Sequence, residues 1–275
     1  MRRKETMRVI VHDDAAAKRL RAAGFVPWTL AGAPEDAWTL TDWFENLYLR
    51  SAGPARYDAL AGHRLSWTHP SVVAALERMR RILAPAFTTA PRVFSRTTFP
   101  ASVAQLFALH PRVAMLLEGD FVPGVAGPAP AQLGVDVDVF VFPGPGPGAT
   151  ERYVVGGGDV ATLMRPPSRA AVELMRFLAS PRAAEVWARR GGFVSPNEQV
   201  ALDAYPDGVT RTIARSLLDA GDGFHFDLSD LQPVAFGGTT GAGMWSLLRD
   251  FIAGKSDARQ TATQLEAAAD AAYRP

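Results

Sequence analysis

Residues 153–197 read YVVGGGDVATLMRPPSRAAVELMRFLASPRAAEVWARRGGFVSPN, and this stretch decides the fold. It predicts a short strand, three glycines from Gly156 to Gly158, and two helices. Adjacent glycines leave a bare backbone that another backbone or a ligand can approach closely. The second helix carries its own boundaries, because Ser180 can accept from the first-turn amides, Pro181 sets φ at the first helical position and Gly191 ends the helix.

The composition of the chain limits the classes of function. A length of 275 residues with 48% hydrophobic residues suffices for one large domain or two modest lobes. The net charge is +1, so neither nucleic acid nor an anionic membrane is favoured as a partner. The chain has no cysteine, which excludes structural disulfides, thiol catalysis and a lipid anchor on cysteine.

The first residues, MRRKETMRVIVHDDAAAK, include basic side chains but no apolar stretch of about 7–15 residues behind them, so they do not form a secretory signal. No apolar run elsewhere approaches the roughly 20 residues that span a bilayer. The sequence as given is therefore expected to remain in the cytoplasm.

Strands and helices are predicted to alternate through the middle of the chain, which indicates an α/β fold. Turn residues and apolar spacing predict helices over 13–23, 41–50, 68–83, 102–109, 207–220, 241–253 and 260–271. Strands are predicted over 112–117 and 135–142, and the PGPGPG run at 143–148 is predicted to be a loop.

Two nucleotide-binding motifs match only in part. Gly156-x-Gly158-x-x-Ala161 follows a strand, but Pro166 and Pro167 prevent the helix that would have to receive a pyrophosphate. Gly254-Lys255-Ser256 resembles the end of a phosphate loop, but Arg249 stands where that loop requires glycine. Nucleotide binding is therefore not expected.

Metal and catalytic chemistry have weak support as well. The five histidines include no i, i+4 pair and have no cysteine beside them, so no zinc site is expected. Asp136 and Asp138 alternate with valines and are interpreted as a solvated strand face rather than a calcium loop. Candidate carboxylate pairs for glycosidase chemistry are Glu118 with Asp120 and Asp227 with Asp230, although turn and cap roles are favoured for them.

The aromatic residues are more informative, because several stand beside turns or glycines instead of within apolar stripes. Such rings can cover the C–H face of a sugar while nearby carboxylates bind its hydroxyls, which is the composition of a small polar-ligand pocket. Half or more of them are expected to be ordinary core residues, and Trp187, in the middle of a helix, is assigned to the core.

The order of several phrases resembles the extracytoplasmic solute-binding proteins of ABC sugar importers. From about Ala22 to Tyr273, these phrases are WTLTDWFENLYL, TTFPASVAQLF, VAMLLEGDF, VVGGGDVATLM, the helix pair ending GGFVSPN, FDLSDLQP-x-x-FGG and GAGMW. The resemblance implies a periplasmic-binding-protein type II clamshell, in which two α/β lobes are joined by a hinge and hold a sugar between them.

The resemblance also implies a site. Trp38, Phe121 and Trp245 would form aromatic walls, Asp120 would bind sugar hydroxyls, and the backbone from Gly156 to Asp159 would be a hinge crossing that lines the cleft. The full set of predicted ligand-binding residues is Trp38, Trp43, Asp120, Phe121, Gly156, Gly157, Gly158, Asp159, Phe236, Gly237 and Trp245.

On the same plan, residues 1–153 are the first part of the C-terminal lobe, 154–210 a returning segment of the N-terminal lobe, and 211–275 the final part of the C-terminal lobe. The second lobe and the hinge are then present, whereas the first lobe is largely missing. The helices within 154–210 are consequently expected to expose apolar faces that normally pack on the missing lobe.

The implied function is the substrate-binding component of an ABC sugar importer, which captures a carbohydrate and delivers it to the permease subunits. Such a component is expected outside the cytoplasm, as a monomer, with no cofactor, no metal and no catalysis. Two alternatives stay open: a non-functional truncated relic, and a glycoside-active enzyme that uses Glu118 or Asp120 with a second carboxylate.

Overall fold

The computed structural model describes residues 14–142, 144, 153–158 and 160–274. The elements up to residue 126 are α1 (Asp14–Ala22), β1 (Val26–Trp28), η1 (Pro34–Asp36), α2 (Thr39–Ala52), α3 (Pro54–Ala61), α4 (Pro70–Ile82), α5 (Pro91–Phe94), α6 (Phe99–Leu106), β2 (Val113–Met115) and α7 (Val122–Ala126). They are followed by β3 (Val154–Gly156), α8 (Arg169–Leu178), α9 (Pro181–Ala188), η2 (Leu202–Ala204), α10 (Gly208–Ala220), η3 (Gly221–Gly223), β4 (Phe224–Phe226), α11 (Val234–Gly237), α12 (Gly243–Ile252) and α13 (Ala258–Tyr273).

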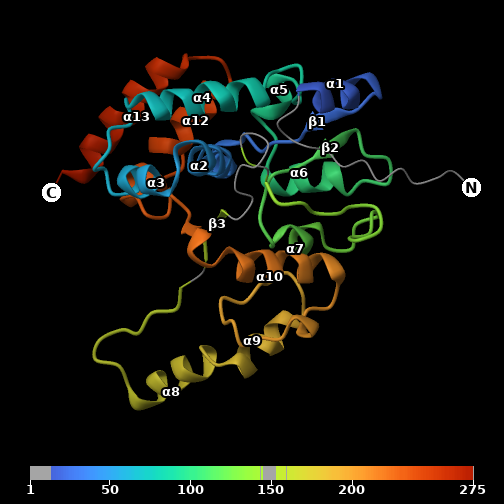
Figure 1. The fold of residues 1–275 in the computed structure, drawn as a ribbon, viewed down its shortest axis with the longest axis vertical. Coiled ribbons are helices and arrows are strands. Elements are labelled where there is room, and N and C mark those ends of the chain that lie inside the picture. The colour runs from blue at the N-terminus through green and yellow to red at the C-terminus, as the bar shows by residue number, and fades with distance from the viewer. Residues whose placement is uncertain (1–13, 143, 145–152, 159, 275) are drawn as a thin grey trace, which may run out of the picture.

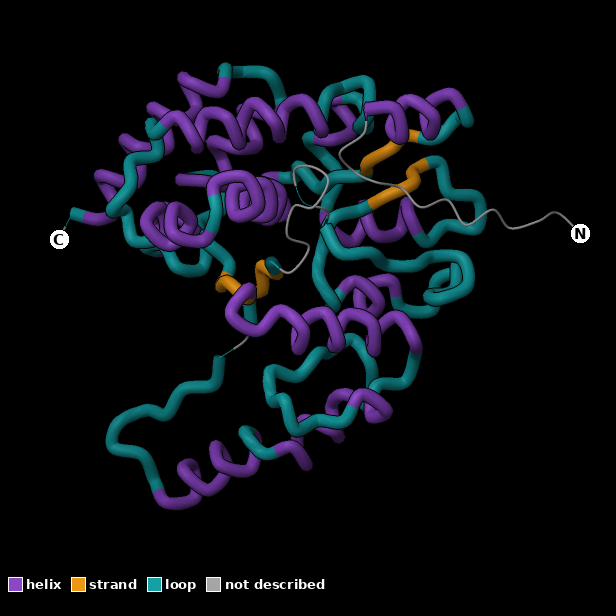
Figure 2. The backbone as a smooth tube through the Cα atoms, in the orientation of Figure 1, coloured by secondary structure: helices purple, strands orange, loops and turns teal. Residues whose placement is uncertain are grey.

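Two bodies are visible in the ribbon. The larger contains α1 to α6 and α11 to α13, the smaller contains α8 and α9, and α10 lies between them (Figure 1). Helices make up most of the regular structure, and the strands are short (Figure 2). Among the described residues, no helix combines the length and the apolar character needed to cross a membrane.

Helix α2 is the centre of the larger body. Leu40, Trp43, Phe44 and Leu47 are spaced i, i+3, i+4 and i+7, so they fall on one face of this helix, and all four are buried. That face packs in one hydrophobic cluster with residues of α4, α12 and α13. The predicted helix at 41–50 is confirmed and is longer than expected.

Two parallel strand pairs connect distant parts of the chain. β1 pairs with β2 through Val26 and Val113, and β2 lies inside the strand predicted at 112–117. β3, the strand predicted after Tyr153, pairs with β4 through Val154 and Phe224. Parallel neighbours need a crossover connection, and in the second pair that connection contains α8, α9 and α10.

The boundaries predicted for α9 are confirmed. Ser180 accepts a hydrogen bond from the Ala183 amide at 3.3 Å, and Pro181 is the first helical residue. Gly191 has φ +78°, a left-handed value that glycine adopts without a steric penalty. The capping residues thus determine this helix locally.

The strand predicted at 135–142 is wrong. The Gln132 amide donates to the Asp136 carboxylate at 3.0 Å, and Leu133 forms only an isolated bridge with Val137. The turn closed by Asp136 outweighs the alternating apolar pattern. Most of the predicted loop at 143–148 lies outside the described residues.

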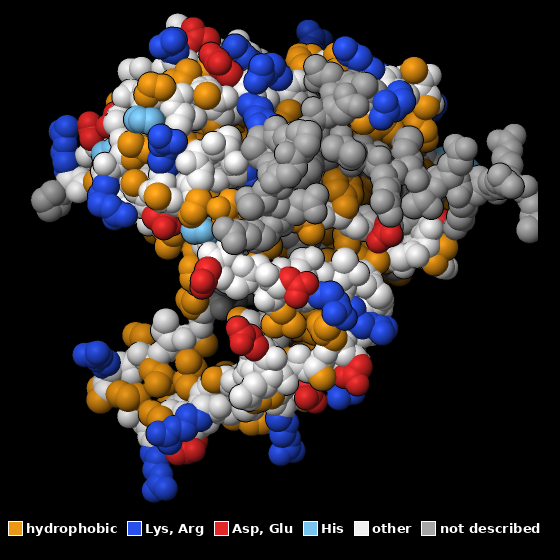
Figure 3. All heavy atoms as spheres, in the orientation of Figure 1, with side chains coloured by type: hydrophobic (Ala, Val, Ile, Leu, Met, Phe, Trp, Pro, Cys, Tyr) orange, Lys and Arg blue, Asp and Glu red, His pale blue; other side chains and the backbone are white. Residues whose placement is uncertain are grey.

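The smaller body exposes apolar side chains, as expected for the helices within 154–210. α8 contains no buried residue, and hydrophobic side chains gather on the surface of the smaller body (Figure 3). The exposed apolar residues include Met164, Leu174, Phe177, Leu178, Val186 and Trp187.

The core assignment of Trp187 is wrong, because this side chain is 55% exposed. Only Ala184 and Ala188 of α9 face the small hydrophobic cluster. Trp187 lies on another face of α9, outside this cluster, and stacks on Phe193 with the ring centroids 4.4 Å apart. Its apolar neighbours in the sequence did not reveal which face of α9 is covered.

Candidate functional site

Three rings held at helix starts form an aromatic cluster: Trp38, Phe99 and Phe121. The ring centroids are 5.1 Å apart for Trp38 and Phe99, 6.0 Å for Trp38 and Phe121, and 5.6 Å for Phe99 and Phe121. Phe99 is buried, whereas Phe121 is 38% exposed and presents apolar surface to solvent. The structure thus brings together two of the three predicted walls and adds Phe99, which the sequence analysis missed although it also stands beside a turn, in Thr98-Phe99-Pro100.

Five carboxyl groups gather in a carboxylate cluster next to these rings: Asp42 and Glu45 on α2, Glu118 after β2, and Asp227 and Asp230 after β4. Carboxylate oxygens of Asp42, Glu45 and Asp227 lie within 4.8 Å of one another. Asp42 stands one helical turn after Trp38, and Glu118 stands three residues before Phe121. The carboxylate cluster therefore adjoins the aromatic cluster.

The turn after β4 is hydrogen-bonded to α2 through the carboxylate of Glu45. Glu45 is completely buried, and its Oε2 and Oε1 accept the amides of Leu228 at 2.8 Å and Ser229 at 3.1 Å. Oδ1 of Asp227 accepts the Ser229 amide at 2.9 Å and the Ser229 hydroxyl at 2.6 Å. Asp227 therefore has the turn role that was favoured for it.

Burial and mutual repulsion raise the pKa of several of these groups. The pKa of Asp42 is well above its ordinary value because of burial first and then the negative charges of Glu118 and Asp227. Burial is also the main cause of the raised pKa of Glu45 and of Glu118. Oε2 of Glu118 is buried and receives no hydrogen bond from the described residues.

Stability should consequently increase as the pH falls from neutral into the mildly acidic range. A carboxyl group with a raised pKa keeps its proton in the folded chain after the unfolded chain has lost it. The free energy of unfolding therefore falls as the pH rises from the ordinary values, 3.8 for Asp42 and 4.5 for Glu118, toward the raised values. Denaturation midpoints measured across this range should show a shallower slope in Asp42→Asn and Glu118→Gln.

The matched control for that slope is Asp203→Asn, which removes an exposed carboxylate on η2. This variant should keep the pH dependence of the wild-type chain. Equal slopes in all four proteins would show that Asp42 and Glu118 do not cause the effect.

The glycines of the predicted hinge lie against the carboxylate cluster. Gly156 pairs with Phe226 between β3 and β4. A Cβ atom on Gly157 would lie 3.2 Å from Oδ2 of Asp230 and close to the side chain of Asp227. Bare backbone therefore borders the cluster, and Gly158 follows with open space around it. Asp159 lies outside the described residues.

Asp120 connects the two bodies. Its Oδ2 accepts the Val194 amide at 2.8 Å, which joins the loop before α7 to the GGFVSPN loop after α9. Burial raises the pKa of Asp120, and the hydrogen bond from Val194 opposes this shift. Asp120 is adjacent to Phe121 in the chain, and in this structure one of its oxygens binds backbone.

The remaining predicted residues lie in or near the core. Trp43 is 1% exposed and packs edge-on against Trp28, and Phe236 and its neighbour Gly237 are buried as well. Trp245 is partly buried, and its Nε1 is buried without a hydrogen-bond partner among the described residues. In the part of the chain that the structure describes, no ring contact joins Trp245 to the aromatic cluster.

Two residues of the carboxylate cluster, Asp42 and Glu45, were not singled out from the sequence. Glu45 carried a usable signal, because it is a charged residue directly after Phe44 on a helix with an apolar face. The same periodicity places Trp43 beside Leu40 and Leu47, which is a core pattern.

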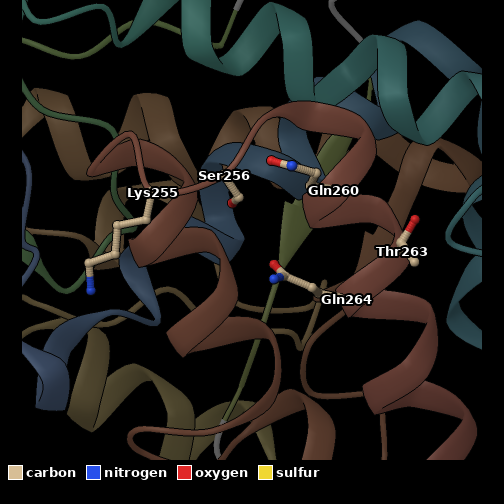
Figure 4. A pocket seen from close by; sticks show the side chains of 5 residues that line it. All are labelled: Lys255, Ser256, Gln260, Thr263 and Gln264. Atoms are coloured by element: carbon tan, nitrogen blue, oxygen red, sulfur yellow. The ribbon is translucent and has the colours of Figure 1, made fainter.

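A shallow hollow lies at the start of α13, lined by Lys255, Ser256, Gln260, Thr263 and Gln264 (Figure 4). The polar groups of Lys255, Ser256, Gln260 and Thr263 already have local partners. Lys255 pairs with Asp250 at 2.8 Å, and Gln260 forms a reciprocal capping box with Asp257. This hollow is explained by the capping of α13.

No family model matches the chain, but two curated relatives do. The chain is 32% identical over 256 residues to the osmoprotective compounds-binding protein of Synechocystis sp., which covers 92% of this chain and 59% of that protein. It is 31% identical over 251 residues to the alpha-glucosides-binding periplasmic protein of Rhizobium meliloti, covering 89% of this chain and 53% of that protein. The chain thus spans little more than half the length of these relatives.

Solved structures with the same fold extend this comparison. A chitin oligosaccharide binding protein superposes with a TM-score of 0.73 at 17% identity, over 94% of this chain and 63% of that one. A bacterial solute receptor with a preference for β-D-galactopyranose superposes with a TM-score of 0.69 at 18% identity, with the same coverage. The resemblance and the fold class predicted from the sequence are confirmed: the chain is related in sequence to solute-binding proteins, one of them named as periplasmic, and has the fold of carbohydrate-binding solute receptors.

Proposed function

We propose that this chain carries the carbohydrate-binding surface of a solute-binding protein of an ABC importer. The observation that carries the proposal is the aromatic cluster beside the carboxylate cluster, at the glycine crossing between the two bodies. The rings of Trp38 and Phe121 would cover the apolar face of a sugar, and carboxylates would accept its hydroxyl protons. The relatives are named for binding osmoprotective compounds and alpha-glucosides, which supports a sugar or a similar polyhydroxyl solute.

We propose that this binding involves no chemistry on the ligand and that an importer's permease pair receives the solute outside the cytoplasm. The relatives are named as binding proteins, and one as periplasmic, which supports both statements. The apolar face of α8 and α9 is then the surface on which the further part of the receptor fold packs. This assignment is supported by the exposed side chains and by the greater length of the relatives.

Trp38→Ala should weaken sugar binding about tenfold, because it removes a stacking ring worth roughly 1–1.5 kcal/mol. Titration calorimetry with an α-glucoside, a chitin oligosaccharide and galactose would measure this change on the full chain. Trp187→Ala is the matched control, since it removes an exposed tryptophan from α9 whose described ring contact is with Phe193 and not with the aromatic cluster. Equal losses in the two variants, or no sugar binding by the wild-type chain, would contradict the proposal.

A further inference from the structure

The carboxylate cluster brings several acidic groups together without a basic partner in any ion pair of the segments that the structure describes. The neighbouring charges with the largest effect on Asp42 and Glu45 are those of other acidic groups, namely Glu118 and Asp227 on Asp42, and Asp227 and Asp42 on Glu45. None of the ion pairs formed by the described residues includes a member of the cluster. Closely spaced carboxylates away from water are costly unless a positive species joins them.

The geometry of three members suits a metal ion. One oxygen each from Asp42, Glu45 and Asp227 lies within 4.8 Å of the other two, which is the spacing of ligands around a single ion. The amides of Leu228 and Ser229 fix Glu45 in place, and Ser229 fixes Oδ1 of Asp227. Three ligands on two elements are thus held by the fold before any ion binds.

A separate observation comes from Glu118, which enters the cluster from the loop after β2. Its carboxyl group is in hydrogen-bonding contact with that of Asp42, although neither group has a donor in its ionised form. The other evidence is Oε2 of Glu118, a buried atom to which no described group donates. Two carboxyl groups in contact need a proton or a cation between them, and a buried oxygen that no group donates to is costly.

We propose that Asp42, Glu45 and Asp227 bind one divalent cation, with Glu118 completing the ligands from the opposite loop. The donors are all oxygen atoms, without histidine or cysteine, which selects a hard ion. Ca²⁺ fits best, because it accepts six to eight oxygen ligands in irregular geometry and can use waters for the positions that the protein leaves open. The site lies beside the aromatic cluster and does not depend on which solute the chain binds.

A second set of neighbouring carboxylates, on α13, differs from the carboxylate cluster in having nitrogen partners. On α13, Glu266 and Asp270 lie 3.5 Å and 3.7 Å from Nε2 of His63, and Oε2 of Glu266 also accepts the amide of Trp67. These carboxylates therefore have nitrogen partners, which the cluster on α2 lacks. Asp270→Asn is accordingly the matched control for substitutions in the cluster.

The test uses the full chain, stripped with a chelator and titrated at neutral pH with CaCl₂ in a calorimeter and with TbCl₃ by luminescence. Trp43 follows Asp42 directly and Trp38 precedes it by one turn, so tryptophan excitation should sensitise bound Tb³⁺, and Ca²⁺ should compete. We expect one saturable site, weakened about tenfold or more by Asp42→Asn and by Asp227→Asn and unchanged by Asp270→Asn. Glu118→Gln should weaken binding less than these two.

Asn and Gln preserve side-chain volume, and circular dichroism identifies any variant that does not fold. Because three members of the cluster are substituted separately, one misfolded variant does not prevent the test. Absence of saturable Ca²⁺ binding by the wild-type chain would overturn the proposal and indicate that protons neutralise the cluster. Binding that survives Asp42→Asn and Asp227→Asn, or that is lost in Asp270→Asn, would overturn it as well.

Discussion

Gly237→Ala should lower the free energy of unfolding by about 3 kcal/mol, which corresponds to a fall in melting temperature of roughly 6–12 °C for a chain of this size. Gly237 ends α11 in the core, and a Cβ atom there would collide with the backbone oxygen of Ser229 and lie 2.7 Å from Cβ of Gln232. Backbone cannot move aside as a flexible side chain can. The displaced Ser229 also donates its amide to Glu45, so the carboxylate cluster should be disturbed with it.

The neighbouring glycine provides the control for this prediction. A Cβ atom on Gly238 would meet nothing within 4 Å, and its φ of −135° suits any residue. Gly238→Ala should therefore change the free energy of unfolding by no more than about 0.5 kcal/mol. Thermal melts followed by circular dichroism would measure both variants, and a similar loss in the two would refute the steric explanation.

Trp43→Ala should cost about 3–5 kcal/mol of stability, the range for removing a large buried aromatic side chain. Its ring packs edge-on against Trp28 at 4.8 Å and Phe142 at 5.8 Å, so the substitution leaves a cavity at the centre of the larger body. Denaturant unfolding monitored by circular dichroism would give the difference.

The same experiment on Trp187→Ala removes an identical side chain from an exposed position. Among the described aromatic residues, Trp187 stacks on Phe193 alone, and about 1 kcal/mol is the expected loss. If Trp43→Ala were as mild as Trp187→Ala, the core position of Trp43 would be incorrect. Trp43 would then return as a candidate for the ligand-binding surface.

Glycine and proline predicted helix boundaries correctly where each boundary depends on interactions close by in the sequence. α9 begins at Pro181 after the Ser180 cap and ends near Gly191, as predicted, because each of these residues acts on amides or dihedral angles within four positions of itself. The strand predicted at 135–142 is wrong because a local interaction was overlooked. The Asp136 carboxylate accepts the Gln132 amide and closes a turn, which the alternation of apolar residues does not reveal.

The sequence by itself therefore determined the longer helices, the fold class, and the aromatic residues from which a pocket could be built, but not β1, β4 or the helix α3. Only the tertiary structure decided that Trp38 faces Phe121 while Trp43, on the same helix, is core. It alone brought Asp42 and Glu45 to Glu118 and Asp227. The reason is physical: these carboxylates stand on segments far apart in the chain, and their proximity depends on the packing of α2 against the turn after β4, which no local pattern encodes.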